Sequence, residues 1–95
     1  TATGNAVAHT VAAPTVSGVA GVTATADKTS AVAGETVTVT VAVAANSAAN
    51  QVTVSATNGT VSPATATTVA AGNTYTFTVV VGSAAPVITV TAATV

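Results

Sequence analysis

The chain has 95 residues, which is enough for one domain with a single core and too few for a second. Ala, Thr and Val contribute 24, 22 and 20 residues, whereas Leu, Met, Trp and Cys are absent, and the formal net charge is −1. One lysine cannot form a basic surface for nucleic acid. Without cysteines, and with a single His and two acids, the composition excludes disulfide frameworks, thiol chemistry and zinc sites.

Strict alternation of apolar and hydroxyl side chains is the strongest local pattern. In residues 36–43, Val occupies every second position, and Thr or Ala fills the positions between. β-Branched residues favour strands, and a period of two places the valines on one face and the hydroxyls on the other. The pattern predicts strands at 19–26, 35–44, 50–57, 64–69, 73–81 and 87–94, with a further extended segment at 5–17.

Turn residues separate these runs. Asn58-Gly59 predicts a tight hairpin, because both residues tolerate positive φ. The frame A-G-x-T-x-T-x-T occurs at 33–40 and again at 71–78, which indicates one turn design used twice. Short strands with one apolar and one hydroxyl face predict an all-β fold, an antiparallel β-sandwich.

Two stretches resemble bacterial immunoglobulin-like domains of the invasin and adhesin type. Residues 23–39, TATADKTSAVAGETVTV, are similar to the opening of such domains, and residues 52–63, VTVSATNGTVSP, to their middle. The resemblance covers about residues 22–94 and implies an immunoglobulin-like sandwich of about seven strands. The acidic and aromatic positions usual in that family are largely missing here, and with them the basis for expecting calcium binding.

From residue 19 onward we predict six strands, one fewer than such a sandwich needs. We therefore divide the chain into an N-terminal extended segment, 1–18, and an immunoglobulin-like β-sandwich, 19–95. A missing strand leaves a groove with unpaired backbone groups, which a strand from the same chain or from a neighbouring subunit can fill. The residues expected to form this donor strand are Ala6, Val7, Ala8, His9, Thr10 and Val11.

Our leading hypothesis is a structural subunit of an extracellular filament or pilus-like surface assembly. It would polymerise by β-strand complementation, because head-to-tail insertion does not close and therefore propagates. Near-zero charge and a thin core of Val and Ala also favour association. The alternatives are an immunoglobulin-like spacer or binding module of a cell-surface adhesin and, more remotely, an ice-binding protein that displays rows of threonine.

The expected partners are other copies of the same chain. A host surface, other cells and covalent glycans are further candidates, whereas neither nucleic acid nor a membrane span is expected. The expected location is extracellular, at the cell surface. The chain starts at Thr1 rather than Met, so we expect a mature chain whose leader has been removed, or a processed fragment.

Chemistry-bearing residues are too few for us to expect catalysis, a cofactor or a metal. His9 is interpreted as a strand-face side chain rather than a ligand or pH switch. Asp27 and Glu35 have no His nearby to form an acid–base pair, so we expect Asp27-Lys28 to start a turn and Glu35 to pair with Lys28 as an exposed ion pair.

Asn58-Gly59-Thr60 is the only N-glycosylation sequon, so Asn58 is a candidate glycosylation site. The predicted hairpin explains the same three residues, and the two interpretations are compatible because a turn tip is exposed. Tyr75 and Phe77, the only aromatic residues, are expected in the core with Val79 rather than on a carbohydrate-binding surface.

Overall fold

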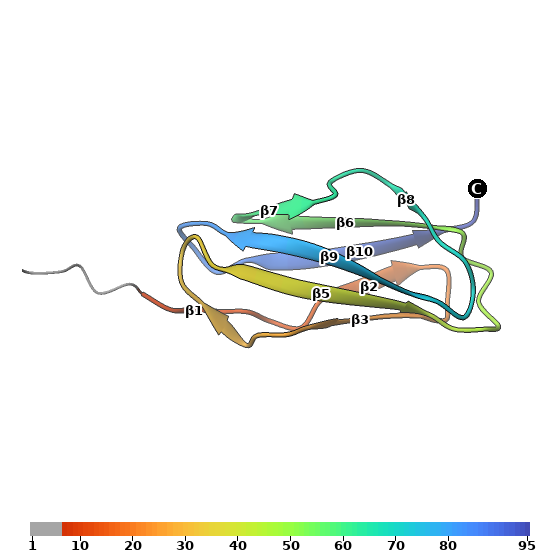
Figure 1. Cartoon of the computed structure of the whole chain (residues 1–95), viewed down its shortest axis with the longest axis horizontal. Helices are drawn as coiled ribbons and strands as arrows, with labels where there is room; N and C mark the ends of the chain where they lie inside the picture. Colours follow the sequence, from red (N-terminus) through yellow and green to blue (C-terminus); the bar gives the residue numbers. More distant parts are fainter. Residues whose placement is uncertain (1–6) are drawn as a thin grey trace, which may run out of the picture.

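A computed structural model describes residues 7–95, in which all regular secondary structure is β (Figure 1). The predicted all-β fold is confirmed. Ten strands follow one another in this part of the chain: β1 (His9–Thr10), β2 (Thr15–Gly18), β3 (Val22–Ala26), β4 (Ser30–Ala31), β5 (Thr36–Val43), β6 (Gln51–Thr57), β7 (Gly59–Ser62), β8 (Thr67–Thr68), β9 (Thr74–Val81) and β10 (Val87–Ala93).

The strands form two four-stranded sheets that pack face to face, and one small pair (Figure 1). The first sheet has the order β3-β5-β9-β7, and all its pairings are antiparallel. The second has the order β2-β10-β6-β8, in which β2 runs parallel to β10 and the other pairings are antiparallel. β1 and β4 form an antiparallel pair at one end of the molecule.

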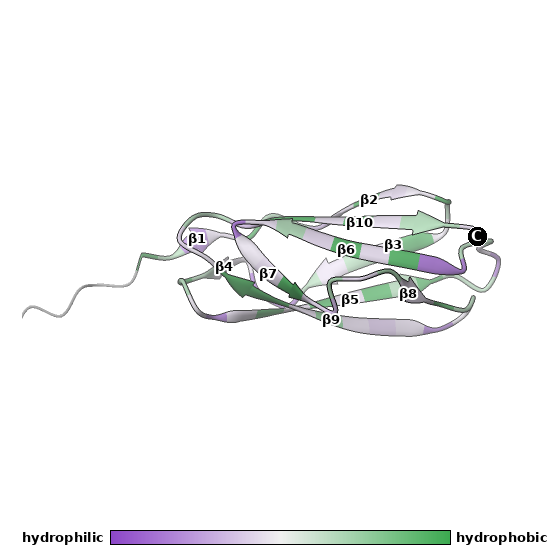
Figure 2. Ribbon diagram, turned by 90° about the horizontal axis from the view of Figure 1, so that it is seen from above, coloured by the Kyte–Doolittle hydropathy of each residue, from purple (hydrophilic) through white to green (hydrophobic). Residues whose placement is uncertain are grey.

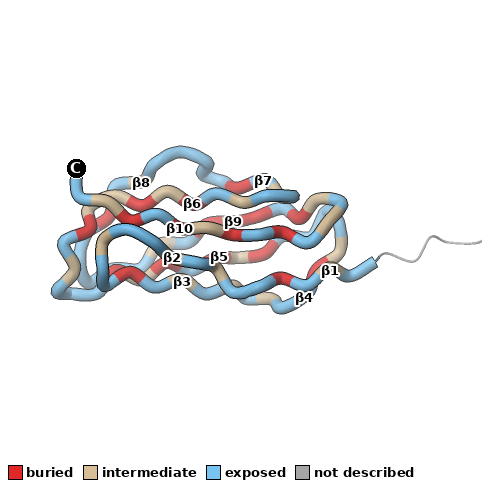
Figure 3. Tube along the Cα trace, turned by 180° about the vertical axis from the view of Figure 1, so that it is seen from behind, coloured by how far each residue is buried: buried red, intermediate tan, exposed pale blue. Residues whose placement is uncertain are grey.

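The core consists of the inward faces of the long strands. On β5 every Val side chain is buried, while the threonines between them point outward. Figure 2 shows the same banding of hydropathy along β6, and Figure 3 shows buried positions alternating with exposed ones. Phe77 and Val79 are buried as predicted, but Tyr75 is only half-buried and its hydroxyl accepts a hydrogen bond from the Ala70 N–H at 2.7 Å. Among residues 7–95 no polar side chain is buried.

The connection at Asn58-Gly59 differs from the predicted hairpin. Asn58 has a φ of 55°, so the left-handed turn residue is present. However, β6 pairs with β10 and β8, whereas β7 pairs with β9 in the other sheet. The hairpin prediction is therefore wrong: an Asn-Gly turn reverses the chain but does not choose the partner, and here β7 crosses to the other sheet, where Val61 is buried.

Two further boundaries differ from expectation. The predicted strand at 64–69 contracts to the two residues of β8, and β7 was not predicted as a strand. The predicted strand at 19–26 begins only at Val22, because residues 19–21 form the turn from β2 to β3. β2 itself, which belongs to the leading segment, is a member of the second sheet.

Candidate assembly site at the edge of β10

The edge of β10 is closed by the leading segment of the same chain. β2 lies along it in parallel register, with Thr15–Gly18 opposite Thr89–Ala92. Ala92 O accepts a hydrogen bond from Val19 N at 3.0 Å, and Ile88 O accepts one from the Thr15 hydroxyl at 3.4 Å. The strand thus satisfies backbone groups that an uncovered sheet edge would leave unpaired.

The pairing of β2 with β10 involves few residues. It covers four of the seven residues of β10, and parallel pairing is slightly less stable per residue than antiparallel pairing. Only Val16 is half-buried and packs against the core, whereas Thr15, Ser17 and Gly18 are exposed (Figure 3). β2 therefore closes the sheet with little apolar burial.

Gly18 makes the close approach of the two strands possible. Its φ is +95°, and a Cβ atom at this position would overlap the carbonyl oxygen of Ala92. Gly21, at the other end of the turn to β3, also has positive φ, at +89°. The leading segment is therefore joined to the sandwich through a short turn with a left-handed glycine at each end.

The residues predicted as a donor strand lie just before β2. His9 and Thr10 form β1 and pair with Ala31 and Ser30 of the same chain. Val11 is 4% exposed, belongs to the core cluster, and donates its N–H to Thr29 O at 2.8 Å. Val7 is 69% exposed and Ala8 is also exposed, while Ala6 lies outside the described residues.

In this single chain, the strand against β10 is thus Thr15–Gly18 rather than residues 6–11. Pro14, just before this stretch, and Gly18, its last residue, are more typical of a linker than of a strand. The sequence does show the alternation of a strand here, because the apolar Val16 lies between the polar Thr15 and Ser17. Four residues with one apolar side chain are too few for the period to identify a strand. Insertion of residues 6–11 into a neighbouring copy remains a prediction.

Asp27 and Lys28 directly follow β3, and their side chains bond to each other and to β5. Asp27 Oδ1 accepts a hydrogen bond from Thr38 N at 2.8 Å, and Lys28 Nζ donates to Thr36 O at 2.6 Å. Lys28 forms its ion pair with Asp27, at 3.5 Å, so the prediction that it pairs with Glu35 is wrong. The Glu35 carboxylate instead accepts from Val32 N at 2.8 Å, within its own turn.

These bonds affect the titration of Asp27. The Thr38 N–H, with a smaller contribution from the Lys28 ammonium, holds the pKa of the Asp27 carboxyl below its ordinary value. Asp27 extends the pairing of β3 with β5 by one residue beyond Ala26. Its N–H donates to Thr38 O at 3.0 Å, and its carboxylate accepts from Thr38 N in return. The role of this group is to end a strand, and it forms no acid–base pair with His9.

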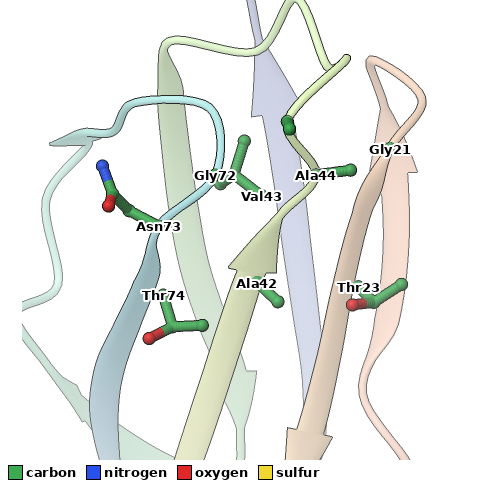
Figure 4. A pocket seen from close by; sticks show the side chains of 9 residues that line it. Gly21, Thr23, Ala42, Val43, Ala44, Gly72, Asn73 and Thr74 are labelled. Atoms are coloured by element: carbon green, nitrogen blue, oxygen red, sulfur yellow. The ribbon is translucent and has the colours of Figure 1, made fainter.

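A hollow of about 430 Å³ opens where β5 ends, between the turns at Gly21 and Gly72 (Figure 4). Its polar side chains are Thr23, Asn73 and Thr74, and the remainder of its lining is Gly, Ala and Val. Among residues 7–95, none of those that line it is titratable.

Asn58 is exposed at the crossing between the sheets. Its Nδ2 donates to Ala85 O at 3.1 Å, and Thr60 of the same sequon is also exposed. Glycosylation at this position remains a prediction.

Comparisons with family models, with curated proteins and with solved structures find no match to this chain. Within residues 7–95, no three side chains of His, Cys, Asp or Glu come together where they could hold a metal ion. The same residues contain no helix that is long and apolar enough to cross a membrane.

We expect Gly18→Ala to loosen β2 from β10, because the new methyl group overlaps the carbonyl of Ala92. Gly72→Ala is the matched control, since Gly72 has a similar φ of +83° with no atom within 4 Å of an added Cβ. The control should lose about 1–2 kcal/mol of unfolding free energy from left-handed strain alone. Denaturant titration should show a larger loss for Gly18→Ala, with faster exchange of the Val19 amide; equal losses would contradict the assignment.

We expect the charge on Asp27 to stabilise the fold at neutral pH. Because its folded pKa is lowered, this contribution is present above the unfolded pKa and is lost as pH falls through the folded pKa. Asp27→Asn removes the charge but keeps an oxygen that can accept from Thr38 N. Denaturant unfolding should show the wild type to be more stable than the variant at about pH 7, with the difference vanishing near about pH 2. A pH-independent difference would contradict this origin.

Proposed function

We propose that the chain is a non-catalytic structural subunit of an extracellular assembly, in which copies are joined by exchange of the leading segment. The observation that carries this proposal is the closure of the β10 edge by β2, a strand attached to the sandwich through the turn at 18–21. The edge accepts a strand, and the strand that occupies it is weakly buried. The same position can therefore receive the equivalent strand of a second copy.

Exchange would preserve the contacts of the segment. In the closed chain, residues 9–18 contribute the β1–β4 pair, the buried Val11 side chain and the β2–β10 pair. If the turn at 18–21 opens, each of these contacts can form identically with the next molecule, as in domain swapping. When each copy donates its segment to one neighbour and accepts the segment of another, rather than exchanging with the same copy, the chain of molecules does not close.

The surface of the sandwich supports an extracellular, assembled state. The outward positions of the long strands carry mainly Thr and Ser, and the chain has only three formally charged side chains. Near-zero charge provides little repulsion between copies. The resemblance to bacterial immunoglobulin-like domains points to the same location and also supports the alternative, a spacer or binding module of an adhesin that does not exchange strands.

A pair of cysteines distinguishes exchange from closure. Ser17 and Thr91 are register partners on β2 and β10, and both are exposed. Neighbouring strands lie about 4.8 Å apart, so cysteines at these positions can form a disulfide. Because the chain has no cysteine of its own, the double variant Ser17→Cys/Thr91→Cys forms disulfides only between the introduced residues. Under oxidation, we expect a ladder of linked chains on a non-reducing gel.

The single variants Ser17→Cys and Thr91→Cys are the controls and should give dimers at most. Removal of residues 1–17 should leave monomers, which light scattering and negative-stain microscopy would detect. If the double variant yields closed monomers alone and the unmodified chain shows no larger particles, exchange is refuted and the adhesin-module alternative is favoured.

One observation favours the ice-binding alternative as a second candidate. Threonines on neighbouring strands of the first sheet lie in register, including the row Thr25, Thr40 and Thr76 and the pair Thr38 and Thr78. If this face binds ice, the chain should show thermal hysteresis, and Thr40→Lys should abolish it. Thr57→Lys, on the exposed face of the other sheet, should leave it unchanged. Absence of thermal hysteresis in the unmodified chain would exclude this candidate.

A further inference from the structure

We infer that the outer edge of β3 is a second interaction surface, at which two copies of this chain pair edge to edge. β3 is the terminal strand of the first sheet, and its pairing with β5 uses one side only. This contact is separate from strand exchange, because β3 belongs to the other sheet and is not part of the leading segment.

The hydrogen bonds between β3 and β5 show which backbone groups of β3 are left free at its outer edge. Ala44 N donates to Gly21 O at 2.8 Å, and Asp27 N donates to Thr38 O at 3.0 Å. In an antiparallel ladder alternate residues direct their N–H and C=O groups to opposite sides. The odd-numbered residues of β3 therefore face β5, and the backbone groups of Val22, Ala24 and Ala26 face the open edge.

The other three edges of the two sheets carry features that oppose pairing. β7 is followed directly by Pro63, β8 has only two residues, and β2 begins just after Pro14 and ends at Gly18. β3 has no Pro, Gly or charged residue from Val22 to Ala26. Natural proteins usually protect sheet edges by such devices. In the described part of the chain, β3 is the edge that lacks them.

The charges that follow β3 do not cover this edge. Asp27 accepts from Thr38 N, and Lys28 donates to Thr36 O, so both side chains are bonded to β5. A lysine that extended over the edge strand would oppose pairing. Here the lysine reaches toward the interior of the sheet.

The edge is complementary to itself. Antiparallel pairing about a two-fold axis at Ala24 places Val22 opposite Ala26 of the second copy and Thr23 opposite Thr25. Val22, Ala24 and Ala26, whose backbone groups face the open edge, then form N–H···O=C hydrogen bonds with their partners, about six in all. Asp27 falls opposite Gly21 and Lys28 opposite Ala20, so no like charges meet. Such an axis also keeps the apolar face of both copies inward and the threonines outward.

The resulting sheet would run through both copies, with one continuous hydroxyl face. Five paired residues form a small interface, so the dimer should be weak and dependent on concentration. Its test is best made on the closed monomer of Ser17→Cys/Thr91→Cys. Oxidation at high dilution favours the disulfide within one chain, and size-exclusion chromatography separates this monomer from any linked chains. In the locked monomer strand exchange cannot contribute, whether or not the unmodified chain exchanges.

Sedimentation equilibrium should show this locked chain to pass from monomer to dimer as its concentration rises to the millimolar range. Amide exchange at Val22, Ala24 and Ala26 should slow with concentration, whereas the Thr23 and Thr25 amides, which bond to β5, should be slow throughout. A locked chain that stays monomeric would overturn the inference. So would association that leaves the exchange of the three amides unchanged.

Two variants locate the contact. Ala24→Pro removes an N–H that the β3–β5 ladder does not use, at an edge position where proline is tolerated. Thr23→Lys/Thr25→Lys places like charges near each other across the interface while leaving the β3 backbone intact. Each should raise the dimer dissociation constant by about tenfold or more.

Thr74→Lys/Thr76→Lys is the matched control, because it adds the same charge to exposed positions of the interior strand β9. It should leave the dissociation constant within a factor of about two to three, since these residues lie away from the β3 edge. If both edge variants dimerise as before, or if the control weakens the dimer equally, β3 is not the contact. Should Ala24→Pro fail to fold by circular dichroism, the lysine pair decides the outcome.

Discussion

The fold depends on the packing of two sheets, whose inward faces consist mainly of Val side chains and bury one another. With no Leu or Met and one Phe, each inward side chain removes little apolar surface from water, at about 1.5–3 kcal/mol for a fully buried Val. Many such positions must therefore act together, and long strands with strict alternation provide them. Val37, Val39 and Val41 of β5 face Val54, Ile88 and Val90 across the sandwich as fully buried side chains of one cluster. A core of this kind has little stability in excess, so closure of the sheet edges has a large influence on the whole molecule.

Edge closure links the fold to the proposed function. The β10 edge is covered by a strand that lies far from β10 in the sequence and buries little, and the β3 edge has no covering strand in the described chain. Both features leave backbone hydrogen bonding as the main means by which another copy can attach. The charged side chains are already occupied: Asp27 and Lys28 bond to backbone groups of β5, and Glu35 bonds within its own turn.

The long strands could be predicted because the alternation of apolar and hydroxyl side chains is a local property of the sequence. The strands 36–43, 51–57, 74–81 and 87–93 agree with expectation to within one residue at each end. β7 was not predicted, and β2 was predicted only as part of the extended segment 5–17. Each has four residues and a single inward Val, which no periodicity can distinguish from a loop. The partner of a strand is a non-local property, so the Asn58 turn indicated a reversal correctly and its pairing wrongly. For the same reason the alternation of residues 6–11 did not indicate that Thr15–Gly18 lies along β10 in the single chain.

The scarcity of charge has one further consequence. The sandwich has a single ion pair among residues 7–95, and its outer faces carry mainly hydroxyl side chains, which water solvates as neutral dipoles. Salt weakens interactions between exposed charges, and here it has almost none to weaken. The screening of charges should thus change the stability of the domain very little between fresh water and brine.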